Sequence, residues 1–204
     1  MALFHHLREK NIEGVKDIIP AYTTLTVVYD IVRVQKQTPG SASVFISSEI
    51  EKALQHCSWN IATSASLIEI PVCYDTSLGI DLKEISKQKK LSIEDIIRIH
   101  ASTIYDVYML GFLPGFAYMG TVDEKIITPR KEKPRLHVAA GSIGIAGAQT
   151  GIYPIDSPGG WQLIGKTPLQ IFNKEKINPC LLKAGDKVQF VAIDKNEFEK
   201  LNEY

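Results

Sequence analysis

The amino-acid sequence predicts an α+β fold, with a small N-terminal domain over residues 1–67 followed by a β-barrel domain over residues 68–204. Two patterns lead to this prediction. The N-terminal part reads as helix, strand, strand and helix, whereas the chain after Tyr105 reads as short strands separated by glycine and proline turns. That spacing favours a closed or nearly closed barrel over stacked βαβ units.

The first elements are a helix and a hairpin. Residues 2–11 read as a short helix. Residues 15–20 and 23–30 are rich in valine and isoleucine, which strands favour, and we expect them to pair with each other. A loop is expected at 35–44 because of its Pro-Gly pair and its serines.

A second helix completes the N-terminal domain. Residues 47–57 carry apolar side chains at helical spacing, with Ser47 or Ser48 as the expected N-cap. The strand-like run 67–74 follows it, so we place the domain boundary at 66–68.

The second domain has one clear helix before its strands. This helix begins at Ser92, with Asp95 three residues later in a capping-box arrangement. Residues 105–111 then alternate like a strand. The apolar face of the helix comprises Ile93, Ile96, Ile97, His100, Ala101 and Ile104. The clearest later strands are 137–147, 167–172 and 187–193.

Composition excludes several classes of protein. Basic and acidic residues both number 23, so the overall field argues against nucleic acid or an anionic membrane as the main partner. No apolar run is long enough for a membrane span or a signal peptide. Cys57, Cys73 and Cys180 are odd in number and widely spaced, which fits a reducing compartment, and we expect a cytoplasmic protein.

Glycines concentrate where the functional surface is expected. Ten of the fourteen glycines lie within 111–168, interleaved with arginines and aromatic residues. Glycine is used where φ is positive or where another group approaches the backbone closely. The stretch therefore indicates a binding surface built from loops.

The first segment, 111–120, places aromatic side chains among three glycines. Phe112, Phe116 and Tyr118 have room there to line a pocket, although an aromatic-packed turn gives the same pattern.

The second segment, 129–135, is basic, and in it an arginine follows each of the two prolines. Guanidinium groups on a stiffened backbone suit bidentate capture of a carboxylate or phosphate, so Arg130 or Arg135 is expected to meet an anion. Lys131 and Lys133 are expected to stay in water, and a wholly solvated basic loop is the alternative.

The third segment, 139–168, offers polar groups for a planar ligand or, alternatively, only tight barrel corners. Asp156 is its candidate base and Trp161 its candidate wall. His100 is a second catalytic candidate, weighed against a buried structural histidine. The candidate donors and acceptors of the segment are Ser142, Gln149, Thr150, Tyr153 and Ser157.

We expect no phosphate-binding loop, no metal site and no hydrolase triad in this chain. Residues 160–167 match the phosphate-loop pattern, but no strand precedes them and a strand-like run, not a helix, follows. The histidines have no cysteine or carboxylate partner at metal-ligand spacing, so we expect no metal site in this chain alone. No self-contained hydrolase triad is recognisable either.

The three segments 111–120, 129–135 and 139–168 resemble the family of B-type 5-oxoprolinase subunits, also described as the allophanate hydrolase subunit 1 and histidine kinase inhibitor family. The resemblance implies a small N-terminal α/β domain and a C-terminal cyclophilin-like, carboxyltransferase-type β-barrel. It implies a protein that acts with a second cyclophilin-like subunit and a third subunit of different fold. Together these open 5-oxoproline to glutamate with ATP, and ATP and Mg are expected to belong to the complex and not to this chain alone.

Carried over by the resemblance, the ligand-facing positions are Phe112, Pro114, Gly115, Tyr118, Arg130, Arg135, Gln149, Tyr153, Ser157, Gly159 and Trp161. Family members begin with a further strand and helix before the region that matches 2–11. The resemblance therefore implies either a shortened start or a hairpin edge covered by a partner.

Other functions stay open at this point. The main alternative is a regulator that docks on a sensor histidine kinase, and another is a subunit of an allophanate or urea amidolyase-type enzyme. A prolyl isomerase is the weakest alternative, because the arginine-centred motif of true cyclophilins is not recognisable.

Overall fold

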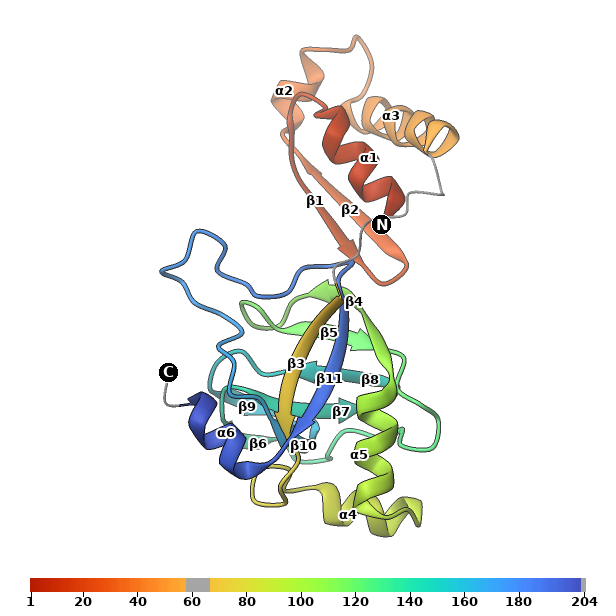
Figure 1. Ribbon diagram of the computed structural model, residues 1–204. Helices are drawn as coiled ribbons and strands as arrows, with labels where there is room; N and C mark the ends of the chain where they lie inside the picture. The colour runs from red at the N-terminus through yellow and green to blue at the C-terminus, as the bar shows by residue number, and fades with distance from the viewer. Residues whose placement is uncertain (58–66, 203–204) are drawn as a thin grey trace. The chain divides into compact units, whose positions relative to one another are not determined.

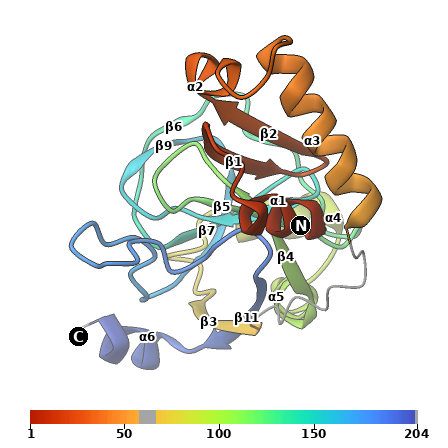
Figure 2. The same cartoon turned by 90° about the horizontal axis from the view of Figure 1, so that it is seen from above.

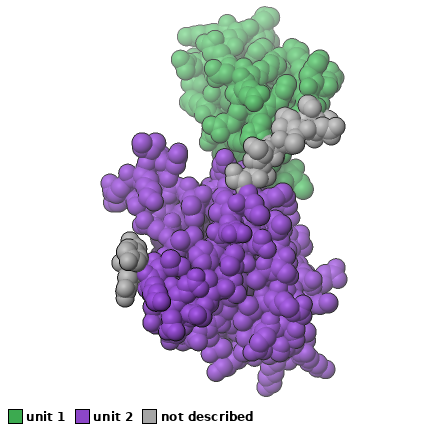
Figure 3. All heavy atoms as spheres, in the orientation of Figure 1, with its two compact units in different colours: residues 1–65 green, residues 66–204 purple. Residues whose placement is uncertain are grey.

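The computed structural model describes residues 1–57 and 67–202. The chain forms two compact units, residues 1–65 and residues 66–204, shown in green and purple in Figure 3. Each unit has its own hydrophobic core.

Within residues 1–57, the first unit consists of a hairpin and three helices. Its two strands pair antiparallel, and the predicted first helix and hairpin are confirmed. Helix α1 contacts both α3 and β1, and α2 contacts α3 (Figure 2). A small core around Val34, Ala42 and Ile46 holds these elements together. The elements are α1 (Ala2–Lys10), β1 (Val15–Ala21), β2 (Thr24–Tyr29), α2 (Ile31–Gln35) and α3 (Ala42–His56).

The third helix begins five residues earlier than predicted. Its N-cap is Ser41, so the expected caps Ser47 and Ser48 are wrong and the loop at 35–44 is shorter. The reason is that buried Ala42 and Ile46 already stand four residues apart on the core-facing side. Ser48 is accommodated inside the helix because its hydroxyl donates to the Phe45 carbonyl at 2.8 Å.

The second unit is built on a closed seven-stranded barrel, as predicted (Figure 1). Around the barrel the strand order is β10, β3, β11, β4, β5, β8, β7. The β3–β11 pair is parallel, and the other pairs in this barrel are antiparallel. The barrel strands are β3 (Leu67–Cys73), β4 (Ile104–Leu110), β5 (Ala117–Gly120), β7 (Ser142–Ala146), β8 (Gln149–Ile152), β10 (Gln162–Lys166) and β11 (Lys187–Ile193).

Alternate strand residues fill the barrel. Ile70 and Val72 of β3, and Ile143 and Ile145 of β7, belong to one core cluster, because side chains two residues apart face the same side of a sheet. Helices α4 (Leu82–Lys89) and α5 (Ile93–Ser102) add apolar side chains to this core, and α6 (Lys195–Asn202) contacts β3.

The predicted start of α5 is confirmed, whereas α4 and α6 were not predicted. The hydroxyl of Ser92 accepts from the Asp95 backbone N–H at 3.0 Å and donates to the Asp95 carboxylate at 2.8 Å. Two polar groups at the helix start are thereby satisfied.

Two of the predicted strands are placed differently. The run 137–147 divides into β6 (Arg135–Val138) and β7, because Gly141 turns the chain at φ 81°. The run 167–172 is not a strand and takes part only in an isolated bridge from Phe172 to Cys180. The strand at this point is β10, which ends before Pro168, a residue without the N–H that a ladder needs.

A second, smaller sheet lies beside a second apolar cluster. Strand β6 pairs antiparallel with β9 (Ser157–Gly159). The cluster comprises Phe116, Val138, Ala146, Tyr153, Trp161 and Leu163.

Candidate functional site

A pocket of about 430 Å³ lies on the barrel unit. Ala146, Tyr153 and Trp161 of this second cluster line it. It is formed by the turn after β4, by β5, by the basic segment, by the β7–β8 turn and by the chain between β9 and β10. Seven of the eleven positions implied by the resemblance line it, namely Phe112, Tyr118, Arg130, Gln149, Tyr153, Gly159 and Trp161. The lining residues not singled out for binding are Pro129, Ala146, Gly147 and Gly160.

The floor of the pocket is a set of edge-to-face aromatic contacts. The ring of Phe116 lies 5.4 Å from Trp161 and 5.3 Å from Tyr153, and Tyr118 lies 5.8 Å from Trp161. Such contacts add to simple burial and restrict ring motion. The floor is therefore largely apolar and closely packed.

Two glycines make room for the indole of Trp161. Gly144 of β7 and Gly151 of β8 are directly paired across the strands. A Cβ at Gly144 would lie 2.9 Å from the Trp161 Cβ, and one at Gly151 would lie 3.1 Å from its Cζ3. Part of the glycine-rich pattern thus exists to seat Trp161 and not to contact a ligand.

Phe112 stands at the rim in an uncommon conformation. Its φ is 67°, in the left-handed region, and 64% of the residue is exposed. Its ring meets Phe116 edge to face at 5.7 Å. A bulky residue held at positive φ and left exposed is typical of a functional surface.

Arg130 supplies the positive charge of the pocket. In the part of the chain that the structure describes, its guanidinium has no hydrogen-bond or ion-pair partner. It lies beside Gly160, since a Cβ there would be 3.7 Å from its Nε and Nη2. Arg130 is therefore available to an anion.

Arg135 and Lys131 are engaged elsewhere. The Arg135 Nη2 donates to the Asp81 carboxylate at 2.6 Å, and its Nη1 donates to the Trp161 carbonyl at 3.3 Å. Lys131 pairs with the same carboxylate at 3.0 Å. The expectation that Lys131 stays in water is wrong, and of the two arginines only Arg130 lines the pocket.

Asp81 is the residue that the sequence pattern missed. It stands just before α4, and 3% of it is exposed. Its partners lie 50 or more residues further along the chain. No local pattern contains such a signal.

His100 belongs to the barrel core and does not line the pocket. It is fully buried and stacks on Phe190 at 4.6 Å. Its Nε2 lies 2.9 Å from the Thr150 hydroxyl and its Nδ1 lies 2.8 Å from the Tyr74 hydroxyl. Because Thr150 donates to the Gly144 carbonyl, it accepts from Nε2–H, and Tyr74 donates to Nδ1.

Burial fixes this histidine as a neutral ring, since desolvation lowers the pKa of His100 to about 3. This environment supports the structural interpretation of His100 and gives no support to a catalytic one.

The remaining predicted positions lie outside the pocket lining. Asp156 is exposed and accepts from the Ala140 backbone N–H at 2.7 Å, which stabilises the turn before β7. Gly115 has φ 82° and packs against Phe172, so it serves the turn. The Ser157 hydroxyl donates to the Pro158 carbonyl. Pro114 is exposed.

The phosphate-loop match is coincidental, as expected. Five of its residues, Gln162–Lys166, form β10 and pair with β7. Gly165 packs against Val72 and Cys73, leaving no concave loop for a phosphate. Among the described residues, no group of three metal-ligating side chains comes together.

The pocket has the chemistry of a binding site. Its ionisable side chains are Arg130, Tyr118 and Tyr153. Burial raises the pKa of Tyr153, partly offset by a hydrogen bond from the Trp161 backbone and by the two arginines. The lining can therefore hold an anionic, planar ligand, but it contains no carboxylate, histidine or cysteine to act as a general base. No helix in the described ranges 1–57 and 67–202 is long and apolar enough to span a bilayer.

Comparison with known proteins gives one consistent family. A family model described as "Carboxyltransferase domain, subdomain C and D" matches residues 1–182. The chain is 45% identical over 201 residues to the B-type subunit of 5-oxoprolinase from Bacillus subtilis (strain 168), covering 97% of this chain and 84% of that protein. It is 39% identical over 178 residues to the protein of the same name from Escherichia coli O157:H7, covering 87% and 78%.

A solved structure agrees with the observed fold. TTHA0988 superposes with a TM-score of 0.79 at 35% identity over 95% of this chain. This chain spans 36% of the length of that one. Since both the family model and the two 5-oxoprolinase proteins match most of its length, this chain belongs to the carboxyltransferase domain family, and within it to the family of B-type 5-oxoprolinase subunits.

Proposed function

We propose that this chain is the substrate-binding subunit of a heteromeric, ATP-dependent 5-oxoprolinase that opens 5-oxo-L-proline to L-glutamate. The observation that carries the proposal is the pocket, which combines one uncompensated guanidinium, Arg130, with aromatic walls and a single amide side chain, Gln149. Its volume of about 430 Å³ is ample for a five-membered lactam.

The functional groups of 5-oxoproline correspond to those of the lining. The substrate has a carboxylate, which suits the two-donor fork of Arg130. Its lactam has one N–H and one C=O, which suit the oxygen and nitrogen of the Gln149 amide. Trp161 and Phe112 offer flat apolar surfaces to the ring.

Catalysis in this proposal is shared between subunits. Opening the lactam adds water across its C–N bond, which calls for a base to activate the nucleophile. The described pocket lining contains no carboxylate, histidine or cysteine. We therefore assign activation of the nucleophile to a second cyclophilin-like subunit or to a third oxoprolinase subunit.

ATP and Mg are assigned to the other subunits for a separate reason. The described residues do not fit a nucleotide site of the phosphate-loop kind, because the matching segment is strand β10. They also offer no cluster of metal ligands. No step of the reaction is attributed to ATP on this chain.

Reconstitution tests the proposal. The purified chain alone should show no 5-oxoproline-dependent ATP hydrolysis and release no glutamate, and both activities should appear when the two partner subunits are added. The measurement is glutamate formation together with phosphate release.

The matched control is 2-pyrrolidinone, which has the lactam but no carboxylate. It should support little turnover, because Arg130 has nothing to bind. Substantial turnover by the lone chain would disprove the shared site, and equal turnover of the neutral lactam would remove the anion-binding role.

A further inference from the structure

Asp81 is a buried carboxylate that is held by two cationic side chains and a backbone N–H. Only 4% of its side chain is exposed. Its Oδ2 accepts from the Leu163 backbone N–H at 2.6 Å, and its Oδ1 contacts Arg135 at 2.6 Å and Lys131 at 3.0 Å. Its own backbone N–H donates to the Leu163 carbonyl at 3.0 Å. A buried carboxylate tolerates desolvation only with such compensation.

The partners of Asp81 lie on two segments of the chain whose neighbouring residues line the pocket. Lys131 and Arg135 lie on the basic segment that carries Arg130, while Leu163 lies on β10, two residues after Trp161. Hydrogen bonds also join these two segments directly. The Lys131 N–H donates to the Gly160 carbonyl at 2.8 Å, and the Gln162 amide donates to the Pro129 carbonyl at 3.0 Å.

This network pairs two of the four cations of the segment, Lys131 and Arg135. Lys131 is neutralised by Asp81 and by Glu84, whose carboxylate lies 3.2 Å from it. Burial lowers the pKa of Lys131, but its hydrogen bonds to Asp81 and Glu84 outweigh burial and raise it, so the lysine stays charged and paired. Arg135 is paired as well. Arg130 has no protein partner among the described residues and, unlike the exposed Lys133, it lines the pocket.

From this geometry we infer that Asp81 is a positioning residue for anion capture. It fixes the basic segment against β10 and engages Lys131 and Arg135, so that Arg130 alone faces the pocket in a defined place. The inference rests on the proposed function, because it assigns Asp81 to the binding of the same carboxylate. Asp81 itself does not line the pocket, so its effect passes through Arg130.

A double-mutant cycle in the reconstituted enzyme tests this inference. Asp81→Asn should raise KM for 5-oxoproline about tenfold, the size expected when a charge-assisted hydrogen bond is misplaced, while kcat changes much less. In an Arg130→Ala background the same substitution should leave KM unchanged, because the group that it positions is gone. A merely structural role would lower the amount of active enzyme equally in both backgrounds.

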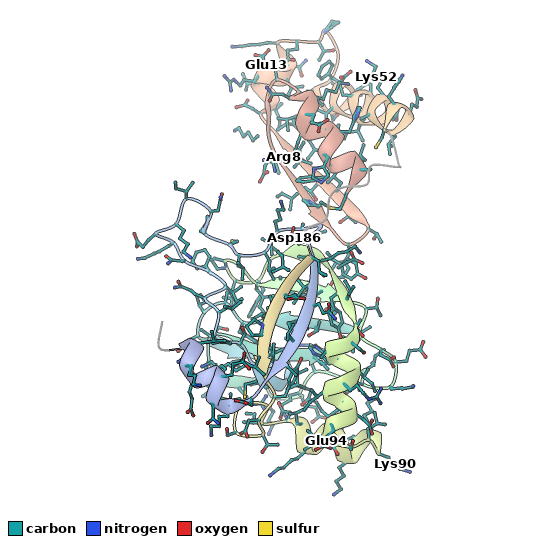
Figure 4. The ribbon with its side chains drawn as sticks, in the orientation of Figure 1. Arg8, Glu13, Lys52, Lys90, Glu94 and Asp186 are labelled. Carbon is teal, nitrogen blue, oxygen red and sulfur yellow. The ribbon has the colours of Figure 1, made fainter. Side chains whose placement is uncertain are left out.

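Asp186→Asn is the matched control for loss of a buried carboxylate. Asp186 precedes β11 (Figure 4), is 2% exposed and accepts from the Lys183 backbone N–H at 2.9 Å. It does not line the Arg130 pocket. Its substitution should lower the melting temperature and leave KM as it is.

A second variant guards against failure of Asp81→Asn to fold. Lys131→Gln removes one of the two cations held by Asp81 at a site with 22% of the side chain exposed. It should raise KM by a smaller factor, again only when Arg130 is present.

The outcomes separate the two proposals. If Arg130→Ala leaves KM unchanged, the assignment of this pocket to the substrate carboxylate is wrong. If Arg130→Ala raises KM but neither Asp81→Asn nor Lys131→Gln does, the positioning role alone is overturned.

Discussion

Arg130 and Arg135 each follow a proline in the same short segment, yet their surroundings differ. Arg135 is bound to the buried Asp81, whereas Arg130 lies at the pocket without a protein partner among the described residues. Substitution of the two arginines therefore has different consequences. Loss of Arg135 removes an ion pair with Asp81, and under the proposed function loss of Arg130 removes the contact to the substrate carboxylate.

Arg130→Lys should lower kcat/KM for 5-oxoproline about tenfold or more, although the charge is kept. An ammonium group cannot reproduce the planar two-donor fork that a carboxylate accepts. The control is Lys133→Ala at an exposed position of the same segment, where a solvated charge contributes only about 0–1 kcal/mol. Steady-state kinetics of the reconstituted complex would contradict the anion site if both variants behaved alike.

His100 should make the barrel sensitive to acid. Its pKa is about 3 in the folded protein, against about 6.5 for an unfolded histidine. Between these values the unfolded chain binds one more proton. The stability present above pH 6.5 is therefore lost as the pH falls toward 3.

The prediction is a difference between two pH profiles. From pH 7 to pH 5 the wild-type protein should lose about 2 kcal/mol more free energy of unfolding than His100→Gln, which does not titrate. Urea unfolding at the two pH values measures this difference. Parallel profiles for the two proteins would show that His100 is not the responsible group.

At the scale of elements, the β7–β8 pair shows why glycine is required at particular positions. Gly144 and Gly151 face Trp161, whereas the neighbouring Ile143, Ile145 and Ile152 belong to the barrel core. The two strands thus use one face for the barrel and the other for the floor of the pocket.

Gly144→Ala should therefore destabilise the protein by about 1–3 kcal/mol through overpacking against Trp161. Gly160→Ala is the control, since its Cβ would meet no heavy atom closer than 3.7 Å. Thermal melts of both variants give the answer. If Gly144→Ala melts with the wild type, Trp161 is not seated as tightly as its contacts indicate.

At the scale of the whole molecule, the pocket is contained within residues 66–204, the larger of the two compact units. The chain has no net charge, so long-range attraction does not bring an anionic substrate to it. Under the proposed function, capture depends instead on the local charge of Arg130. A pocket whose lining contains no carboxylate, histidine or cysteine is consistent with the proposal of a protein that works as one subunit among several.

The sequence by itself determined the local features of this protein. Period-two alternation and glycine turns predicted the barrel, and the Ser92 cap predicted the start of α5, because these signals depend on residues close together in the chain. The two glycine-rich segments, and the basic segment between them, likewise indicated the loops that line the pocket. Helix α3 shows the limit, since serines that suit a cap also fit inside a helix when apolar spacing continues through them.

Only the tertiary structure decided which of those residues act together. Asp81 meets Arg135 across 54 residues of sequence, and that pairing distinguishes the anchored arginine from the one that faces the pocket. His100 and Asp156 were both catalytic candidates in the sequence, but His100 is buried in the barrel core and Asp156 is exposed at a turn. Burial, pairing and exposure arise when distant segments pack, and they set the charge and reach of each side chain.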